Sequence, residues 1–287
     1  MNFLKKKNKL KPGWIFSQNG NLWRFIFGGD NLIVGETRDL NKRIVYFFVI
    51  DISSGKTLLK NFLFEDGNYW ISIEGATSEL VFLHRYDKPE LPYHKNIIAL
   101  DIKTGNKLWE NEKYLYLFNT KENLYGIKQN FESYEIVELN LKEGNVKSVI
   151  PTEEHSGIYE IKNSAEDLQH EFSDYPVKYE SGTVQNISNI ITNETKNIEY
   201  KGEIEYLVKE NFLIFNYYVP AGIDLKDLNK KYYENRFRIF DINTGEILYS
   251  DILNAKSTYN VPDNFFTKNN NLFYLREKKE IIFIELK

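Results

Sequence analysis

The chain has 287 residues, of which 42% are hydrophobic and 15% aromatic, and its formal net charge is −4. This composition excludes a disordered chain. Charges of both signs are interspersed, which excludes the basic stripe of a nucleic-acid-binding protein. The sequence contains no cysteine, so we expect neither a disulfide nor a cysteine-ligated metal.

The first residues are basic, with lysines at positions 5, 6, 7, 9 and 11. Short terminal charge runs are commonly solvated tails, and we expect the same here. No apolar stretch of about 7–15 residues follows them, as a signal peptide would require. No apolar run approaches the roughly 18 residues of a membrane-spanning helix. We therefore predict a cytoplasmic protein with no membrane span.

A strand that ends at an Asp and turns back within a few residues is the clearest pattern along the chain. Its copies share a Gly four positions after the Asp, and two of them have Thr before the Gly and an aromatic residue eight positions after the Asp. The copies are Asp51 with Gly55; Asp101 with Thr104, Gly105 and Trp109; and Asp241 with Thr244, Gly245 and Tyr249.

Weaker copies extend the pattern to six anchors that lie roughly 40–50 residues apart, the size of one four-stranded propeller blade. The anchors are Asp51, Asp101, Asn140, Thr192, Asp241 and Glu285. Alternation of apolar and polar residues predicts four strands in each unit, with helices confined to 165–172 and 225–233. We predict one all-β domain over residues 1–287, a six-bladed β-propeller, with seven blades as the alternative. The predicted blades are 20–63, 68–112, 114–150, 156–201, 203–252, and 258–287 completed by 10–16.

The residues of this motif all have a structural explanation. The Asp carboxylate accepts hydrogen bonds from backbone N–H groups two or three residues on, and Gly supplies the positive φ that a tight hairpin needs. The aromatic residue after the turn is expected to leave the outermost strand and pack between neighbouring blades. The motif therefore predicts a fold and no reaction.

The last anchor, Glu285, is not followed by a fourth strand, while an extra strand-like segment containing Trp14 precedes the first unit. We predict that residues 10–16 pair with 280–286 and complete the last blade. Such an exchange between the chain ends pairs sheet edges that would otherwise be exposed.

The string from Ala99 to Trp109 resembles the repeat of quinoprotein-like β-propellers, where Ala-x-Asp-x-x-Thr-Gly-x-x-x-Trp recurs blade by blade. The chain as a whole also resembles a small family of uncharacterised bacterial propeller proteins. The resemblance implies the propeller fold. Quinone-dependent dehydrogenases of this type use an adjacent Cys pair, and the related outer-membrane assembly lipoproteins need a lipobox Cys. This chain has no Cys, so the resemblance implies neither activity, and we predict no cofactor.

Histidine and acidic residues occur together in two segments. His84 and His94 flank a loop with Asp87 and Glu90, which are residue types that bind metal ions, but the spacing matches no ligand motif. The second segment would place Asp167, His170, Glu171 and Asp174 on one face of a helix. Ordinary surface histidines and a solvated acidic turn are the preferred interpretations, so we predict no metal site.

Two insertions between the second and third strands of a unit, at 87–96 and 219–234, are the strongest functional hints. In a propeller such loops share one face, and long loops on one face often bind partners. The predicted binding face comprises Tyr93, His94, Asp224, Tyr232 and Tyr233. The leading hypothesis is a non-catalytic scaffold for an unknown protein or peptide. The alternative is an enzyme or small-molecule binder at the central channel, whose catalytic residues the sequence does not identify.

Overall fold

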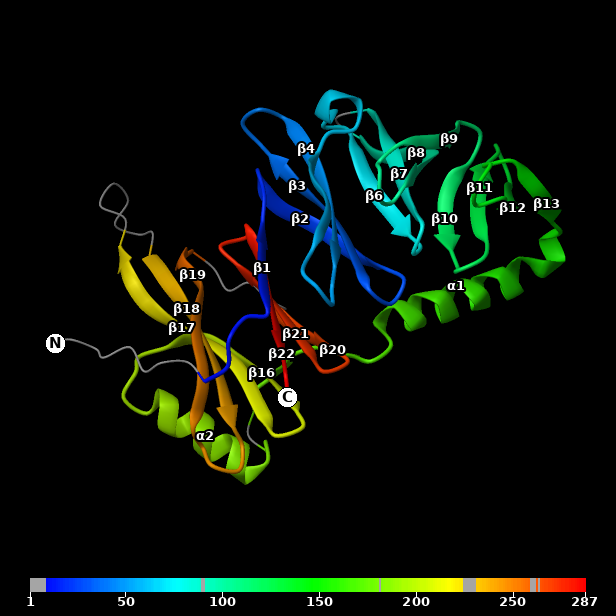
Figure 1. Cartoon of the computed structure of the whole chain (residues 1–287). Coiled ribbons are helices and arrows are strands. Elements are labelled where there is room, and N and C mark those ends of the chain that lie inside the picture. The colour runs from blue at the N-terminus through cyan, green and yellow to red at the C-terminus, as the bar shows by residue number, and fades with distance from the viewer. Residues whose placement is uncertain (1–8, 89–90, 181, 224–230, 259–261, 263) are drawn as a thin grey trace. The chain divides into compact units, whose positions relative to one another are not determined.

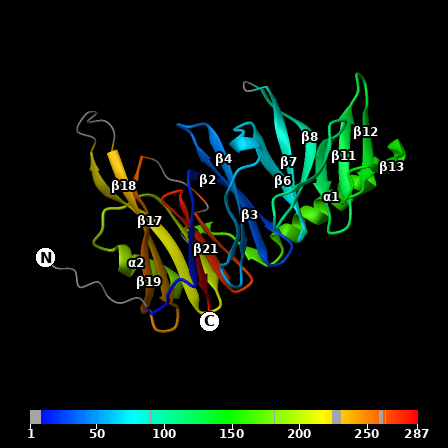
Figure 2. The same cartoon turned by 45° about the horizontal axis from the view of Figure 1, so that its top comes forward.

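The computed structural model describes residues 9–88, 91–180, 182–223, 231–258, 262 and 264–287. The chain folds into two compact units, which are described separately (Figures 1 and 2). The middle unit is Gln18–Glu171, and the terminal unit combines the described residues up to Ser17 with those from Phe172 onward. Both units are built mainly of antiparallel β-sheets, as the sequence predicts.

The middle unit contains three four-stranded sheets, each formed by four strands that follow one another in the chain. The first sheet is β2 (Asn21–Gly28), β3 (Leu32–Asp39), β4 (Ile44–Asp51) and β5 (Thr57–Phe62). The second is β6 (Ile71–Ala76), β7 (Leu80–Lys88), β8 (Leu91–Asp101) and β9 (Lys107–Asn111). The third is β10 (Leu115–Asn119), β11 (Leu124–Gln129), β12 (Tyr134–Leu139) and β13 (Val146–Ile150). The single-turn helices η1 (Glu65–Gly67) and η2 (Thr152–Glu154) and the helix α1 (His155–His170) complete the unit.

The core of the middle unit lies between successive sheets. β4 is buried along almost its whole length, since its β-branched and aromatic residues face a neighbouring layer on both sides. One apolar cluster joins the first and second sheets, and another joins the second and third. The second sheet is therefore covered on both faces, and its central strands lie in a largely dry environment.

The terminal unit contains two five-stranded sheets and one further helix, α2 (Gln185–Thr195). One sheet has the order β15 (Val177–Lys178), β16 (Lys201–Lys209), β17 (Phe212–Ile223), β18 (Lys231–Asp241) and β19 (Ile247–Ser257). The other has the order β1 (Trp14–Ser17), β22 (Glu280–Glu285), β21 (Asn271–Arg276), β20 (Phe265–Lys268) and β14 (Ser173–Asp174).

The predicted pairing of the two chain ends is confirmed. β1 runs antiparallel to β22, with Trp14 opposite Phe283 and Ser17 opposite Glu280. The rings of Trp14 and Phe283 stack with centroids 5.0 Å apart and planes at 2°. The N-terminal strand thus covers the edge of β22 that would otherwise be unpaired.

The fourth predicted blade, at 156–201, is wrong. Most of this segment is helical, in α1 and α2, and its strands are the two-residue β14 and β15. Thr192, one of the six anchors, lies inside α2. The physical reason is a helical apolar period: Ile187, Ile190 and Ile191 lie on one buried face of α2, at the spacing of adjacent helix turns. The described residues therefore form five sheets, and not the six units that the anchors predict.

The two predicted helices are also corrected. The segment 165–172 is the second half of the longer α1, which ends at His170. Of the segment 225–233, residues 231–233 belong to strand β18, and the others lie outside the described residues. No helix in the described ranges is long and apolar enough to cross a membrane.

Candidate metal centre

Each clear copy of the repeat forms a turn around its own acidic side chain. Asp101 Oδ1 accepts hydrogen bonds from Thr104 Oγ1 and Thr104 N, both at 2.8 Å, and from Lys103 N at 3.1 Å. The Thr104 hydroxyl and the backbone N–H groups lower the pKa of Asp101. Gly105 has a φ of +73° and donates to the Asp101 carbonyl at 2.8 Å. Equivalent turns occur at Asp51 with Gly55 and at Asp241 with Thr244 and Gly245.

The aromatic residue after the second turn joins two sheets. Trp109 is 9% exposed, and its Nε1 donates a 2.9 Å hydrogen bond to the carbonyl of Leu141, beside the turn of the third sheet. A Cβ placed on Gly144 of that turn would lie 2.4 Å from the Trp109 ring. In the terminal unit, the Tyr249 hydroxyl lies 2.8 Å from that of Tyr274. These aromatic residues are buried in packing contacts between strands and sheets.

The residues predicted to form a binding face have different environments. Tyr93 is 66% exposed on β8, whereas Tyr233 on β18 is only 7% exposed. Tyr232 is half-buried, and the Lys256 ammonium lies 6.0 Å from its ring centroid. Asp224 lies outside the described residues. Tyr93 and His94 belong to the middle unit, and Tyr232 and Tyr233 belong to the terminal unit.

Three strands of the second sheet bring one titratable side chain each to a common point: Glu74 from β6, His84 from β7 and His94 from β8. Two irregularities in strand pairing make this possible. The β6–β7 register shifts between Ile73 and Gly75, which leaves Glu74 as the extra residue of a bulge. The β7–β8 register shifts between the pair Leu83–Ile98 and the pair Arg85–Lys95, where β8 has one residue more than β7. β-Bulges re-aim side chains and are frequent beside functional sites.

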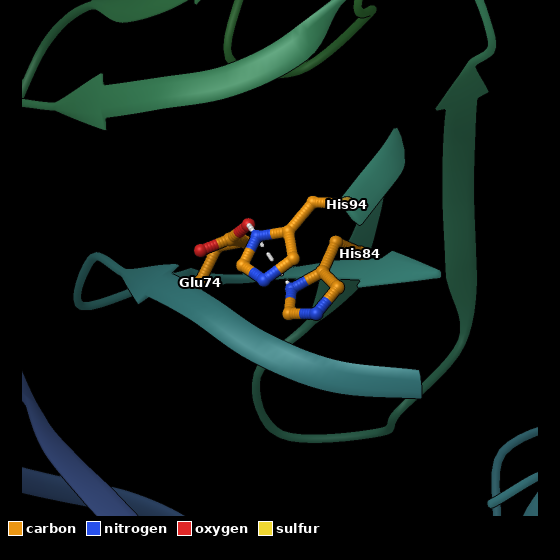
Figure 3. Close-up of side chains that lie close together, drawn as sticks. All are labelled: Glu74, His84 and His94. Carbon is orange, nitrogen blue, oxygen red and sulfur yellow. Dashed lines mark hydrogen bonds and ion pairs between the residues drawn. The ribbon is translucent and has the colours of Figure 1, made fainter. Parts of the chain in front are cut away.

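The two imidazoles lie against one carboxylate oxygen, as Figure 3 shows. Glu74 Oε1 lies 2.6 Å from His94 Nδ1 and 3.0 Å from His84 Nδ1. The imidazole rings stack with centroids 3.6 Å apart and planes at 10°. The Tyr86 ring meets both imidazoles edge-on, at 80° to His84 and 90° to His94.

The cluster is closed at one end and open at the other. The side chain of His84 is 2% exposed, that of Glu74 11% and that of His94 41%. Burial raises the pKa of Glu74, but the contacts with His84 and His94 lower it further, to about 2. Glu74 is therefore a carboxylate at neutral pH, available as an anionic ligand.

His84 is the unusual member. Its Nδ1 lies 3.0 Å from Glu74 Oε1, but neither ring nitrogen has a hydrogen-bond partner within the described part of the chain. Leaving a buried polar group without a partner costs roughly 1–3 kcal/mol. A buried imidazole whose nitrogens make no hydrogen bond, and whose Nδ1 lies beside a carboxylate, is well placed to coordinate a metal ion.

The ligand atoms already approach the separations that a metal ion requires. The candidate ligand atoms of Glu74, His84 and His94 all lie within 4.8 Å of one another. Around a tetrahedral Zn²⁺ with bonds of about 2.1 Å, neighbouring ligand atoms are about 3.4 Å apart. The parallel rings must open for both nitrogen lone pairs to point at one ion, and the His94 side chain, 41% exposed, is the less buried of the two imidazoles.

A second buried charged cluster in the same unit serves as a contrast. The Glu36 carboxylate accepts hydrogen bonds from Arg38, from the Ser72 hydroxyl and from Ile73 N. Arg38 also donates to the carbonyls of Tyr69 and Ile71. This ion pair ties the first sheet to the second and has its hydrogen bonds satisfied, so it needs no ligand.

The sequence interpretation of this region is corrected in three respects. His84 is 1% exposed and is not a surface histidine. Asp87 pairs with Lys95 at 3.3 Å instead of joining the histidines, and Glu90 lies outside the described residues. Glu74 was not among the predicted site residues. The available sequence signal was a charged residue within the apolar strand that begins with Ile71 and Ile73. In the second acidic segment, Asp174 belongs to β14 and does not continue the α1 helix.

Comparison with protein families gives one match, a domain of unknown function (DUF4905) whose model matches residues 28–109. That range contains Glu74, His84 and His94. No curated protein matches the chain.

Solved structures that resemble the chain are distant in sequence. A crystal structure of a eukaryotic initiation factor aligns with a TM-score of 0.33 at 9% identity, covering 81% of this chain and 55% of that chain. The chain thus spans about half the length of that protein. An uncharacterised protein from Listeria monocytogenes aligns with a TM-score of 0.33 at 11% identity, covering 90% of this chain and 75% of that chain. The β-propeller domain of the Trilobed protease from Pyrococcus furiosus aligns with a TM-score of 0.28 at 11% identity, covering 90% of this chain and 64% of that chain.

Proposed function

We propose that this protein binds a divalent transition-metal ion, Zn²⁺ by ligand chemistry, through Glu74, His84 and His94. The observation that carries the proposal is the convergence of two imidazoles and one carboxylate from three adjacent strands, with ligand atoms within 4.8 Å of one another. Imidazole and carboxylate are established zinc ligands, and three protein ligands leave a fourth position open.

The environment of His84 supports this proposal. Coordination would give a lone pair of the buried imidazole a partner, and the negative charge of Glu74 would balance part of the ion's charge. Mg²⁺ and Ca²⁺ prefer sets of oxygen ligands, so two imidazoles disfavour them. The site therefore selects transition metals over the common alkaline-earth ions.

Isothermal titration calorimetry with ZnCl₂ at pH 7.5 tests the proposal. We expect one ion per chain and no measurable heat with MgCl₂ under the same conditions. His94→Asn removes the most exposed ligand and should weaken binding by about 100-fold or more, since loss of even an outer-shell contact costs about 10–100-fold. Glu74→Gln keeps the shape of the side chain, removes its charge, and should also weaken binding strongly.

The matched control is His170→Asn, which makes the same chemical change at an exposed position of α1, outside the cluster. It should bind Zn²⁺ like the wild-type protein. Circular dichroism of each variant checks that the fold is intact. Equal Zn²⁺ affinity in the wild-type protein and the His94→Asn variant would overturn the proposal.

A second candidate function is the cytoplasmic, non-catalytic scaffold for a protein or peptide that the sequence predicts. The observation that favours it is the length of two hairpins, β7–β8 and β17–β18, whose strands have 9–12 residues, and the 66% exposure of Tyr93 on the first of them. Within this proposal, the sheets are blades of a β-propeller with quinoprotein-like turns. Tyr93→Ser should abolish retention of a specific partner identified by mass spectrometry, while the unfolding temperature stays unchanged.

A further inference from the structure

The hairpin of β7 and β8 extends beyond the sheet that carries it. β6 ends its pairing with β7 at Ile71 opposite Arg85, and β9 begins its pairing with β8 at Ile97 opposite Asn111. Beyond these points Tyr86 N still donates a 2.9 Å hydrogen bond to the carbonyl of Trp70, and the two strands otherwise pair with each other, as in Tyr86 opposite His94. We call residues 85–88 and 91–95 the hairpin arm. A two-stranded ribbon is marginally stable by itself, so the arm depends on whatever anchors its base.

One face of the base already has such an anchor. The Arg85 guanidinium pairs with both carboxylate oxygens of Glu65, and its Nε lies 3.1 Å from Glu110 Oε1. Asn96 Nδ2 donates to the same Glu110 oxygen at 2.8 Å. Because neighbouring residues of a strand point to opposite faces, this anchor lies on the face opposite to His84.

On the face that carries His84 and His94, the Tyr86 ring meets the Trp70 ring edge-on, with centroids 6.4 Å apart, and His94 provides a second contact with the sheet. His94 is the only member of the Glu74–His84–His94 cluster that belongs to the arm. Its contacts with the sheet there are the 2.6 Å bond to Glu74 and the stacking on His84. The side chain of His94 is 41% exposed, so water competes for this bond.

From this arrangement, and resting on the proposed metal site, we infer that the ion acts as a conformational lock for the hairpin arm. An ion held by Glu74, His84 and His94 would join β6, β7 and β8 at the base of the arm. The arm can then open on this face only after a metal–ligand bond breaks. Tyr93 precedes His94, so locking His94 also restrains the backbone that carries the exposed Tyr93 side chain.

Hydrogen–deuterium exchange tests this inference on the full chain, with ZnCl₂ alone as the probe. In the wild-type protein, Zn²⁺ should slow exchange of the amides of residues 93–95 by roughly tenfold or more, because the bound ion favours the closed state. The amides of residues 212–219 in the terminal unit serve as the internal reference and should exchange at an unchanged rate. His94→Asn should remove the effect, and His170→Asn should retain it.

The outcomes separate the lock from the proposed metal site. If calorimetry shows one bound Zn²⁺ but residues 93–95 exchange at the same rate, the lock is wrong and the metal site stands. If residues 212–219 are protected as strongly as the arm, the ion stabilises the chain generally and the lock is again wrong. If Zn²⁺ does not bind, both proposals fail.

Discussion

Trp109 provides the most direct test of how the repeat motif holds successive sheets together. Its indole is 9% exposed, lies against Gly144 and donates a hydrogen bond to the Leu141 carbonyl in the neighbouring sheet. Replacing a buried Trp by Ala costs about 3–5 kcal/mol, through lost transfer free energy and the cavity that remains. We therefore expect Trp109→Ala to lower the free energy of unfolding by about 3–5 kcal/mol.

Two further variants divide this cost into its causes. Trp109→Phe keeps much of the ring volume and loses the hydrogen bond, so it should cost about 1–2 kcal/mol. Leu108→Ala removes the neighbouring side chain, which is 49% exposed, and should cost about 1 kcal/mol or less. Urea unfolding followed by circular dichroism measures all three.

A double-mutant cycle with Gly144→Ala tests the contact itself. Alone, this change should be costly, because Gly144 has a φ of +71° and its new Cβ would lie 2.4 Å from the indole ring. When Trp109→Ala removes the ring, only the backbone strain of about 1–2 kcal/mol should remain, so the two costs are not additive. Additive costs, or a Trp109→Ala variant as stable as Leu108→Ala, would refute the packing role of this residue.

Three other predictions concern different parts of the fold. Deleting residues 1–17 removes β1 from the edge of β22 and should lower the unfolding temperature by roughly 5–10 °C; an unchanged temperature would contradict the role of this strand. Gly35→Ala places a Cβ 2.1 Å from the Phe48 ring and should cost about 1–3 kcal/mol in urea unfolding, whereas Gly157→Ala, which meets nothing within 4 Å in α1, should not destabilise. Burial, together with the nearby Glu194 carboxylate, raises the pKa of Tyr217 to about 12, although Arg238 lowers it. The contribution of the un-ionised Tyr217 hydroxyl to stability should therefore be complete below pH 10 and be lost between pH 10 and 12. The unfolding temperature of Tyr217→Phe should not show this fall between pH 10 and 12.

The sequence was most informative where the structure is local. The turn at Asp101 is closed by groups within four residues of one another, so its spacing predicts its geometry. The same logic failed at Thr192, where a regular spacing of anchors was extended over a segment whose apolar residues have a helical period. The pairing of Trp14 with Phe283 was predictable despite the distance between them along the chain, because a last unit with three predicted strands and an extra strand before the first unit complement each other.

The candidate metal centre shows the limit of this approach. His84 and His94 were recognised as a pair, but the spacing along the chain linked them with Asp87 and Glu90 and not with Glu74. The bulge at Glu74 and a separate register shift between β7 and β8 bring Glu74 and the imidazoles together, and both depend on pairing with a neighbouring strand. Burial of His84 depends likewise on the packing of sheets around it.

The sequence by itself thus determined the antiparallel strands, the acidic turns that connect them and the union of the two chain ends, because these follow from alternation, turn chemistry and repeat length. Only the tertiary structure decided the number of sheets in the described residues, the helices of the 156–201 segment and the meeting of Glu74, His84 and His94. Those features depend on which strands pair and in which register. A shift of one residue there redirects a side chain to the opposite face of the sheet.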